Sequence, residues 1–470
     1  MRKNIGVLFP VASLPGNHGI GDFGDSCYTF IKWLSKHHYR YWQILPLNPL
    51  GPGNSPYMST CSEAIDVRYI SLDYLKDEGL LDEVPTYRKN ATFIRFQDVL
   101  DFKLKYLKKA YKNYLLTPGH GLKKFKTKNP WAMHFATYVT FKALNHDAPW
   151  NKWPKWQMEY FDHHHKPPRQ FLEEIDFQIF MQYMAAKQWK AVLSFARRRK
   201  MTIIADCPFY VGYDSTDCWM HKDQFLFDEK YNPTMVSGVP PDAFSDVGQL
   251  WGTPIYDFKK MKEDGYTFLV DRIGAIAKTC DLLRLDHFRA WDTYCVIPAE
   301  DTDAKRGRWE IGPRTDFFDK LYEKYPGINL IAEDLGDLTP GVHELRDHYN
   351  LPGMFIYEFT IFDWEAFPTE RQIVYPGTHD NQTLWGWFKS LDDKQKAMIN
   401  QRLNYPKNLY RGIFNYIWNA KSCFTIFQLQ DLLKLDDTAR LNSPGTVGDP
   451  NWCFKIKDFQ KLAKVKYGYR

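Results

Sequence analysis

Three short strings place acidic side chains directly after apolar, strand-like runs. They are LRLDHFR with Asp286, IAEDLG with Glu333, and GTHDN with Asp380. Because loop residues follow each run, each acid is expected at the C-terminal tip of a strand. Acids at three tips of one sheet can converge on one small volume. Cleavage of a glycosidic bond needs paired carboxylates that flank the reacting carbon, so the pattern favours glycosidic-bond chemistry.

Asp286 lies between Arg284 on one side and His287 and Arg289 on the other. These neighbours are expected to favour the charged carboxylate. An ionised carboxylate near neutral pH can act as a nucleophile. The alternative is an aspartate that the arginines hold in a purely structural role.

Glu333 projects from the end of a buried run, where partial desolvation is expected to raise its pKa. A raised pKa suits a general acid that protonates a leaving oxygen and later activates the acceptor. Asp334 competes for this role, but successive strand residues point in opposite directions, so only one of the two can face the site. The alternative is an acid that caps the following turn.

Asp380, which follows His379, is the third acid. It could hold sugar hydroxyls as the ring flattens toward an oxocarbenium ion, a contact that strengthens in the transition state. The alternative is an aspartate that caps a turn in the GTHDN loop.

The elements that must position these acids alternate between strands and helices. Helical patterns cover 26–36, 188–199, 265–279 and 315–324. Nearly continuous apolarity predicts strands that are buried on both faces, as in a parallel sheet. Eight strand–helix units predict a (β/α)₈ barrel with its chemistry at the strand C-termini. An open doubly wound sheet is the alternative, although no G-x-G-x-x-G follows a strand. The eight apolar runs are 5–11, 41–45, 202–205, 282–285, 329–332, 354–357, 373–375 and 424–427.

The spacing of the runs is uneven, and it predicts how the barrel is divided. Residues 1–72 are expected to form its first part and residues 201–470 the remainder. Residues 73–200 read as a mainly helical insertion whose last helix returns to the barrel. A segment at about 210–256, rich in Asp, Gly and Pro, reads as a smaller loop subdomain that covers the substrate.

Composition excludes several classes of protein. Aromatic residues make up 17% of the chain, which fits a bulky core or a sugar site. The net charge is only +6. Lysines 103, 105, 108, 109 and 112 read as one solvated helix face, and lysines 123, 124, 126 and 128 as a loop. No nucleic-acid recognition motif accompanies them, so a nucleic-acid partner is not predicted.

Eight cysteines without a C-x-x-C pair indicate reduced thiols rather than a zinc cluster. The start of the chain, interrupted by Pro10 and Pro15, does not read as a signal peptide, and no run reaches membrane-spanning length. A cytoplasmic protein without a membrane partner is therefore expected. His163-His164-His165 lacks the spacing of a metal site, and Asp22, Asp301 and Asp303 lack EF-hand spacing, so no metal is predicted.

The motifs together resemble the 4-α-glucanotransferases of the amylomaltase type, glycoside hydrolase family 77 of the α-amylase superfamily. The resemblance spans nearly the whole chain in family order. It rests on SLPG at 13–16, WQILPL at 42–47, GNSPY at 53–57, GVPPD at 238–242, GQLWG at 248–252, GRW at 307–309, the run 377–387 and NSPGT at 442–446.

The resemblance implies a retaining transglycosylase that uses no cofactor. Its donors would be α-1,4-glucans, such as maltooligosaccharides or starch and glycogen fragments, and glucose would be an acceptor. Asp286 would be the nucleophile, Glu333 the acid/base, and Asp380 the transition-state stabiliser. Substrate-binding positions would be Tyr57, Asp206, Phe244, Gln249, Trp251, Arg284, His287 and His379.

One departure bears on the products. The family often has an aromatic pair where this chain has Ala243-Phe244, so the formation of large cyclic glucans does not follow from the resemblance. Two other functions stay open at this point. One is an α-1,4-glucan hydrolase with the same acids, and the other is a glucan-binding protein without activity.

Overall fold

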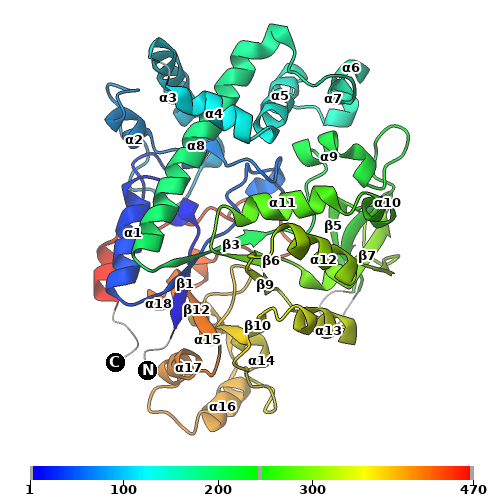
Figure 1. Cartoon of the computed structure of the whole chain (residues 1–470). Coiled ribbons are helices and arrows are strands. Elements are labelled where there is room, and N and C mark those ends of the chain that lie inside the picture. Colours follow the sequence, from blue (N-terminus) through cyan, green and yellow to red (C-terminus); the bar gives the residue numbers. More distant parts are fainter. Residues whose placement is uncertain (1–3, 118, 242–245, 466–470) are drawn as a thin grey trace.

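The structure is a computed structural model that describes residues 4–117, 119–241 and 246–465 (Figure 1). Phe244, expected to bind substrate, lies outside these residues. Among the described helices, none combines the length and the apolarity that crossing a membrane requires.

Eight parallel strands form the central sheet, in the order β10-β11-β12-β1-β2-β3-β6-β9. The Ala332 N–H donates to the Pro352 carbonyl oxygen at 2.9 Å and joins the two ends of the sheet. The predicted (β/α)₈ barrel is therefore confirmed, and every strand lies on one of the eight apolar runs. The bounds are β1 Ile5–Leu8, β2 Tyr41–Gln43, β3 Thr202–Cys207, β6 Leu282–Leu285, β9 Leu330–Ala332, β10 Gly353–Ile356, β11 Gln372–Tyr375 and β12 Phe424–Gln428.

The apolar runs form strands because both faces of the sheet are covered. One face encloses a compact apolar cluster inside the barrel, which includes Leu8, Ile204, Ile331 and Ile373. The other face packs against helices, among them α11, which contacts β3 and β6. The helices outside the stretch between β2 and β3 are α1 Asp25–Lys36, α9 Thr216–Met220, α10 Phe258–Glu263, α11 Thr267–Ala277, α12 Arg314–Lys324, α13 Pro340–His348, α14 Tyr357–Thr360, α15 Leu384–Ser390, α16 Asp393–Arg402, α17 Leu409–Trp418 and α18 Leu429–Leu432.

Further helices fill the long stretch between β2 and β3. In Figure 1 helices α3 to α7 gather at one end of the molecule, and α8 runs from them to the barrel. The division at residues 72/73 and 200/201 stays a prediction. The helices are α2 Leu72–Asp77, α3 Phe96–Leu116, α4 His120–Lys128, α5 Trp131–Leu144, α6 Lys155–Met158, α7 Tyr160–His163 and α8 Leu172–Arg198.

Lysines 105, 108, 109 and 112 are exposed on helix α3, as expected, but the expectation was wrong for Lys103 and for the second lysine run. Lys103 is fully buried, and its ammonium donates to the Asp22 carboxylate at 3.0 Å and to the carbonyl oxygens of Arg68 and Ile70. Burial of a charge is tolerated where it is paired and fully hydrogen-bonded, which helical spacing cannot reveal. The second lysine run lies in helix α4 rather than in a loop.

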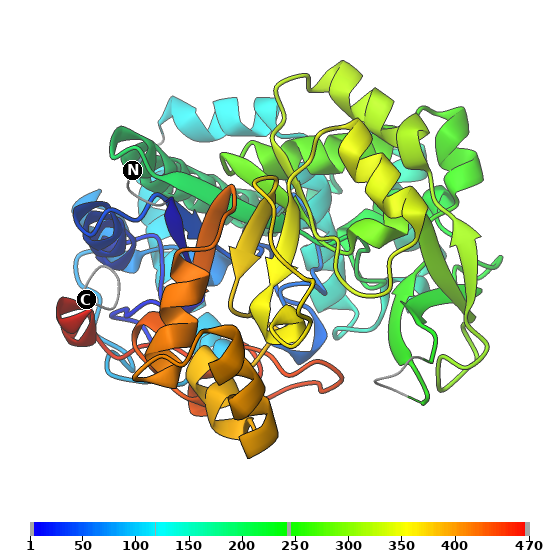
Figure 2. The same ribbon diagram turned by 90° about the horizontal axis from the view of Figure 1, so that it is seen from below.

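A second, four-stranded antiparallel sheet lies at one side of the barrel (Figure 2). Its strands are β4 Met235–Val239, β5 Gln249–Pro254, β7 Thr293–Pro298 and β8 Arg308–Ile311, in the order β5-β4-β7-β8. The sequence patterns did not predict this sheet, because much of β5 and β8 is exposed and carries polar side chains.

Candidate active site

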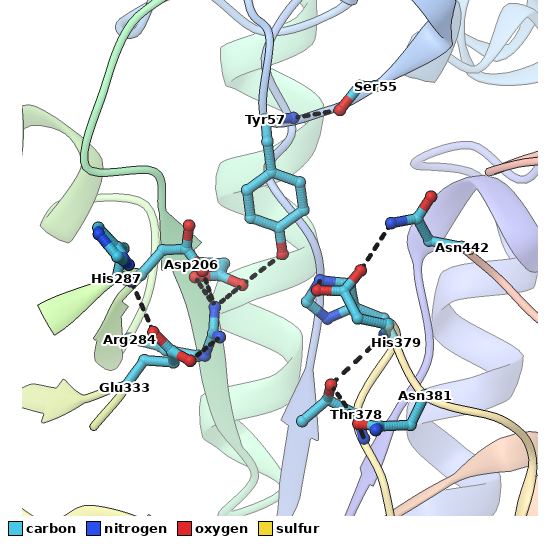
Figure 3. Close-up of polar contacts among 12 residues, drawn as sticks. Ser55, Tyr57, Asp206, Arg284, His287, Glu333, Thr378, His379, Asn381 and Asn442 are labelled. Atoms are coloured by element: carbon cyan, nitrogen blue, oxygen red, sulfur yellow. Dashed lines mark hydrogen bonds and ion pairs between the residues drawn. The ribbon is translucent and has the colours of Figure 1, made fainter. Parts of the chain in front are cut away.

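A single buried arginine connects the ends of three neighbouring barrel strands. Arg284, in β6, donates from Nη1 to both carboxylate oxygens of Asp206 at 2.8 and 2.7 Å. The same Nη1 donates to Asp286 Oδ1 at 2.8 Å, and Nη2 lies 3.9 Å from Glu333 Oε1 (Figure 3). The parallel register places Asp206 of β3 beside Arg284. One guanidinium thus gathers three carboxylates from three strands.

Asp286 is the first residue after β6, and its side chain is 28% exposed. Burial raises the pKa of Asp286 to about 6, although Arg284 opposes the rise. The expectation that neighbouring arginines would dominate was therefore wrong in its net direction. Arg289 does not assist, because its guanidinium lies 3.6 Å from the centre of the Trp309 ring. A carboxyl group with this pKa is still ionised at neutral pH.

Glu333 follows β9 and is held by the backbone of the neighbouring strand's loop. Its Oε2 accepts a hydrogen bond from the His287 N–H at 2.7 Å. Burial, followed by the negative charge of Asp286, raises the pKa of Glu333 well above its ordinary value, despite opposition from Arg284. Of this close pair, Glu333 is the member that keeps its proton, as a general acid requires.

Asp334 points away from the site, as strand alternation requires. Its carboxylate accepts hydrogen bonds from Arg346 Nη1 at 2.6 Å and from the Met354 N–H at 2.7 Å. The side chain is 2% exposed and fully occupied by these contacts with α13 and β10. Glu333 is therefore the acid of this string that remains for chemistry.

In the GTHDN loop the side chain of Asn381, and not that of Asp380, caps the turn. Asn381 Oδ1 closes the turn by accepting from the Thr378 N–H at 2.8 Å and from its hydroxyl at 2.9 Å. Asp380 Oδ1 accepts instead from Asn442 Nδ2 at 2.7 Å, and its Oδ2 lies 3.3 Å from His379 Nε2. Burial alone would raise the pKa of Asp380, but His379 and Asn442 outweigh it and lower the pKa.

Tyr57 and His379 form parallel aromatic faces at the site. Their ring centres lie 5.2 Å apart with an angle of 12° between the planes. The Tyr57 hydroxyl donates to Asp206 Oδ2 at 2.6 Å. Asp206 itself is only 1% exposed, and both of its oxygens are occupied by Tyr57 and Arg284. Asp206 therefore positions Tyr57 and Arg284 through these contacts.

Two of the three acids, Asp286 and Asp380, line a cavity of about 610 Å³, whereas Glu333 is not part of its lining. Asp286, His287 and Asp380 line it at the barrel end, while Gln249 and Trp251 line it from β5. The edge of the Trp251 ring packs near His287, with 4.9 Å between ring centres, and its Nε1 donates to Gln249 Oε1 at 3.2 Å. Burial, followed by the charge of Arg289, lowers the pKa of His287 to about 4, so this imidazole is neutral. The second sheet thus supplies one wall of the cavity.

The C-terminal segment contributes residues that sequence reasoning did not assign. Besides the contact from Asn442, Arg440 Nη2 donates to the Asp380 carbonyl oxygen and its Nε to the Asn442 carbonyl oxygen, both at 2.6 Å. Trp452 also lines the cavity. Sixty residues separate Arg440 from Asp380, and no local pattern joins them. The family strings NSPGT at 442–446 and Asn451-Trp452 were the available signals for Asn442 and Trp452.

Replacing Asn442 is expected to weaken the support of Asp380. Asn442→Ala removes a hydrogen bond to a charged group, worth about 1.5–3 kcal/mol, and is expected to lower kcat/KM by about 10- to 100-fold. Asn442→Asp is expected to lose more, because it places a second carboxylate beside Asp380. Steady-state kinetics of both variants test this. Near-normal activity of Asn442→Asp would contradict the assigned contact.

Comparison with known proteins relates the whole chain to one family. A family model described as 4-alpha-glucanotransferase matches residues 9–461. The 4-alpha-glucanotransferase of Clostridium butyricum is 35% identical, with 95% of each chain covered. The chloroplastic/amyloplastic 4-alpha-glucanotransferase of Solanum tuberosum is 34% identical over 97% of this chain and 82% of its own. The structure of amylomaltase from Streptococcus agalactiae in complex with acarbose matches with a TM-score of 0.91 and 30% identity, covering 98% of this chain and 97% of that one.

Proposed function

This chain belongs to the 4-alpha-glucanotransferase family, and we propose that it transfers α-1,4-glucan segments to glucose or another glucan by a retaining double displacement. The observation that carries the mechanism is the shared guanidinium of Arg284. It holds Asp286 while Glu333, at the next strand tip, retains its proton. A nucleophile and an acid of different pKa are what two successive displacements at one carbon need.

In the first displacement, the Asp286 carboxylate attacks the anomeric carbon of the donor glucan. The bond from that carbon to the glycosidic oxygen breaks, and Glu333 gives its proton to the departing oxygen. The donor segment remains as a glycosyl ester on Asp286, and the rest of the donor departs. Asp380, kept ionised by His379 and Asn442, holds ring hydroxyls and stabilises the positive charge that develops on the sugar.

In the second displacement, an acceptor hydroxyl replaces the departed glucan. The Glu333 carboxylate takes its proton as the oxygen attacks the anomeric carbon and the ester to Asp286 breaks. Two inversions restore the α configuration, and Glu333 is protonated again. The reaction closes without a metal or another cofactor. Among the described residues, no group of three or more His, Cys, Asp or Glu side chains could hold a metal ion.

The cavity walls suit a glucan rather than water as the second reactant. Trp251 offers an aromatic face in the cavity that Asp286 and Asp380 line, and Gln249 offers hydrogen-bonding groups. Tyr57 and His379 offer a stacked aromatic pair for the sugar whose bond is broken. We assign maltooligosaccharides or starch and glycogen fragments as donors, glucose as an acceptor, and a role in their metabolism in the cytoplasm.

Incubation with maltotriose separates transfer from the two other functions. Transfer is expected to yield glucose together with maltopentaose and longer products, while the total number of reducing ends stays constant. Hydrolysis by the same acids would increase that number and yield only shorter sugars. A binding protein without activity would leave maltotriose unchanged. Chromatography of the products, with a reducing-end assay on the same samples, distinguishes the three.

The pH dependence of kcat/KM is expected to be bell-shaped. Asp286 must be ionised, and its pKa of about 6 predicts that activity falls about tenfold per unit as the pH drops below 6. Activity falls again at alkaline pH as Glu333 loses the proton that it must donate. A profile measured with maltotriose tests both limbs. An acid limb near about 4, the ordinary aspartate pKa, would contradict the environment assigned to Asp286.

A further inference from the structure

A second cavity, of about 160 Å³, shares no lining residue with the active-site cavity. Its walls come from the loop after β2, from α5, from α9 and the residues after it, and from the start of α11. Four carboxyl groups line it, contributed by Glu63, Asp217, Asp264 and Asp271. The mechanism proposed above uses none of these groups.

The four carboxyl groups outnumber the cations near them. These cations are Arg272 in the lining, Lys324, which pairs with Asp271, and Lys278, whose charge acts on Glu63. Arg272 is the one lysine or arginine in the described lining, and its guanidinium is committed elsewhere. It donates to Ser62 Oγ at 2.8 Å and to the carbonyl oxygens of Pro208, Phe209 and Tyr210 at 2.7, 3.2 and 3.3 Å. The charge of Arg272 therefore stays in the lining, but protein oxygens occupy these N–H donors.

The two histidines of the lining add no positive charge near neutral pH. Burial, followed by the charge of His221, lowers the pKa of His134 to about 4. Burial also lowers the pKa of His221, although Asp217 opposes the change. Both imidazoles are therefore neutral, and the cavity remains negative.

Two buried oxygens in the lining lack a hydrogen-bond partner within the described chain. They are Thr216 Oγ1 and Gln224 Oε1, on residues that are 5% and 7% exposed. An unsatisfied buried acceptor costs about 1–3 kcal/mol, so a ligand with N–H donors would be favoured. Trp131 and Phe268 add aromatic faces, which attract ammonium groups.

The pKa of Glu63 reflects the burial and the charges of this cavity. Burial and the charges of Asp217 and Asp271 together raise the pKa of Glu63 to about 8, although the charge of Lys278 opposes the rise. The carboxyl group therefore holds a proton at neutral pH. A bound cation would stabilise the ionised form and release that proton.

The arrangement of the lining side chains bears on the kind of cation. No group of three or more His, Cys, Asp or Glu side chains in the described chain could hold a metal ion. We propose that this cavity binds a small organic cation with a primary ammonium group, which pairs with the Glu63 carboxylate in place of its proton. Arg272 connects the two cavities. It lines this one and donates to the carbonyl oxygens of Pro208, Phe209 and Tyr210, which line the active-site cavity. The proposal does not depend on the transfer reaction.

Calorimetric titration with 1,4-diaminobutane tests the proposal, with 1,4-butanediol at equal ionic strength as the neutral control. Binding of the diamine is expected to tighten by up to about tenfold per unit between pH 6 and 8, because one proton is displaced. Buffers of different ionisation enthalpy should report release of up to one proton. The diol should give no saturable heat. Equal binding of the diol, or no saturable binding of the diamine, would overturn the proposal.

A variant pair locates the binding. Glu63→Gln is expected to weaken the diamine at least tenfold at pH 8 and to remove the pH dependence, whereas Glu229→Gln, on an exposed loop, should match the wild type. Diamine binding that Glu63→Gln leaves unchanged would place the cation elsewhere, including the active site, and would overturn the proposal. If Glu63→Gln fails to fold, the wild-type titrations still test the proposal, because diamine binding without proton release would contradict it.

Discussion

Asp286→Asn is expected to abolish glucan transfer, with kcat lowered by at least about 10⁴-fold, because the nucleophile of the first displacement is lost. The fold should persist. Arg284 keeps both hydrogen bonds to Asp206, so no buried charge loses its last partner. Thermal unfolding should therefore differ little from the wild type. Product analysis with maltotriose, on protein of verified melting temperature, measures the effect.

Two further variants sharpen this result. Asp286→Ala cannot regain a carboxylate by deamidation, so any activity that returns with time in the asparagine variant but not in the alanine variant has that origin. Asp337→Asn serves as the matched control, because its side chain is 99% exposed. Substantial activity in both Asp286 variants would exclude this residue as the nucleophile.

Glu333→Gln is expected to slow transfer from natural glucans by about 10²- to 10⁴-fold, because the departing oxygen no longer receives a proton. A donor whose leaving group needs no proton, such as α-maltosyl fluoride, should be spared in the first displacement. Fluoride release during the first turnover, compared with maltotriose turnover, measures the difference between the donors.

The second displacement of this variant offers an independent check. Glutamine cannot take the acceptor's proton, so the glucosyl ester should accumulate. Azide needs no general base and should accelerate turnover while forming an α-glycosyl azide. Equal impairment with both donors, and no effect of azide, would contradict the acid/base role of Glu333.

The barrel could be predicted because its strands are buried on both faces. The run 282–285 coincides with β6, and the other runs overlap their strands with shifted ends. The second sheet escaped prediction for the opposite reason. Its strand β8 is largely exposed and pairs along one edge with β7. Its side chains therefore face solvent, and its sequence lacks the apolar run of a buried strand.

Part of the site could also be predicted from local sequence, and part could not. The apolar runs placed Asp286 and Glu333 directly after β6 and β9, while Asp380 lies farther along the loop that follows β11. Parallel strands end together, so all three follow strand C-termini at one end of the barrel. Contacts between side chains of different elements could not be predicted from local sequence patterns. The burial of Asp206 beneath Tyr57 and the support of Asp380 by the 440–442 segment depend on side chains far apart in sequence. The roles of these acids were supplied by the family resemblance.

Trapping the glucosyl ester tests the central claim most directly. An activated α-glucosyl fluoride with an additional ring fluorine slows both displacements, since it destabilises their oxocarbenium-like transition states. Proteolysis and mass spectrometry of Glu333→Gln treated with this reagent should find one sugar, on the peptide that contains Asp286. Attachment to a peptide that lacks Asp286, or an inverted product with no adduct, would contradict the double displacement proposed for this site.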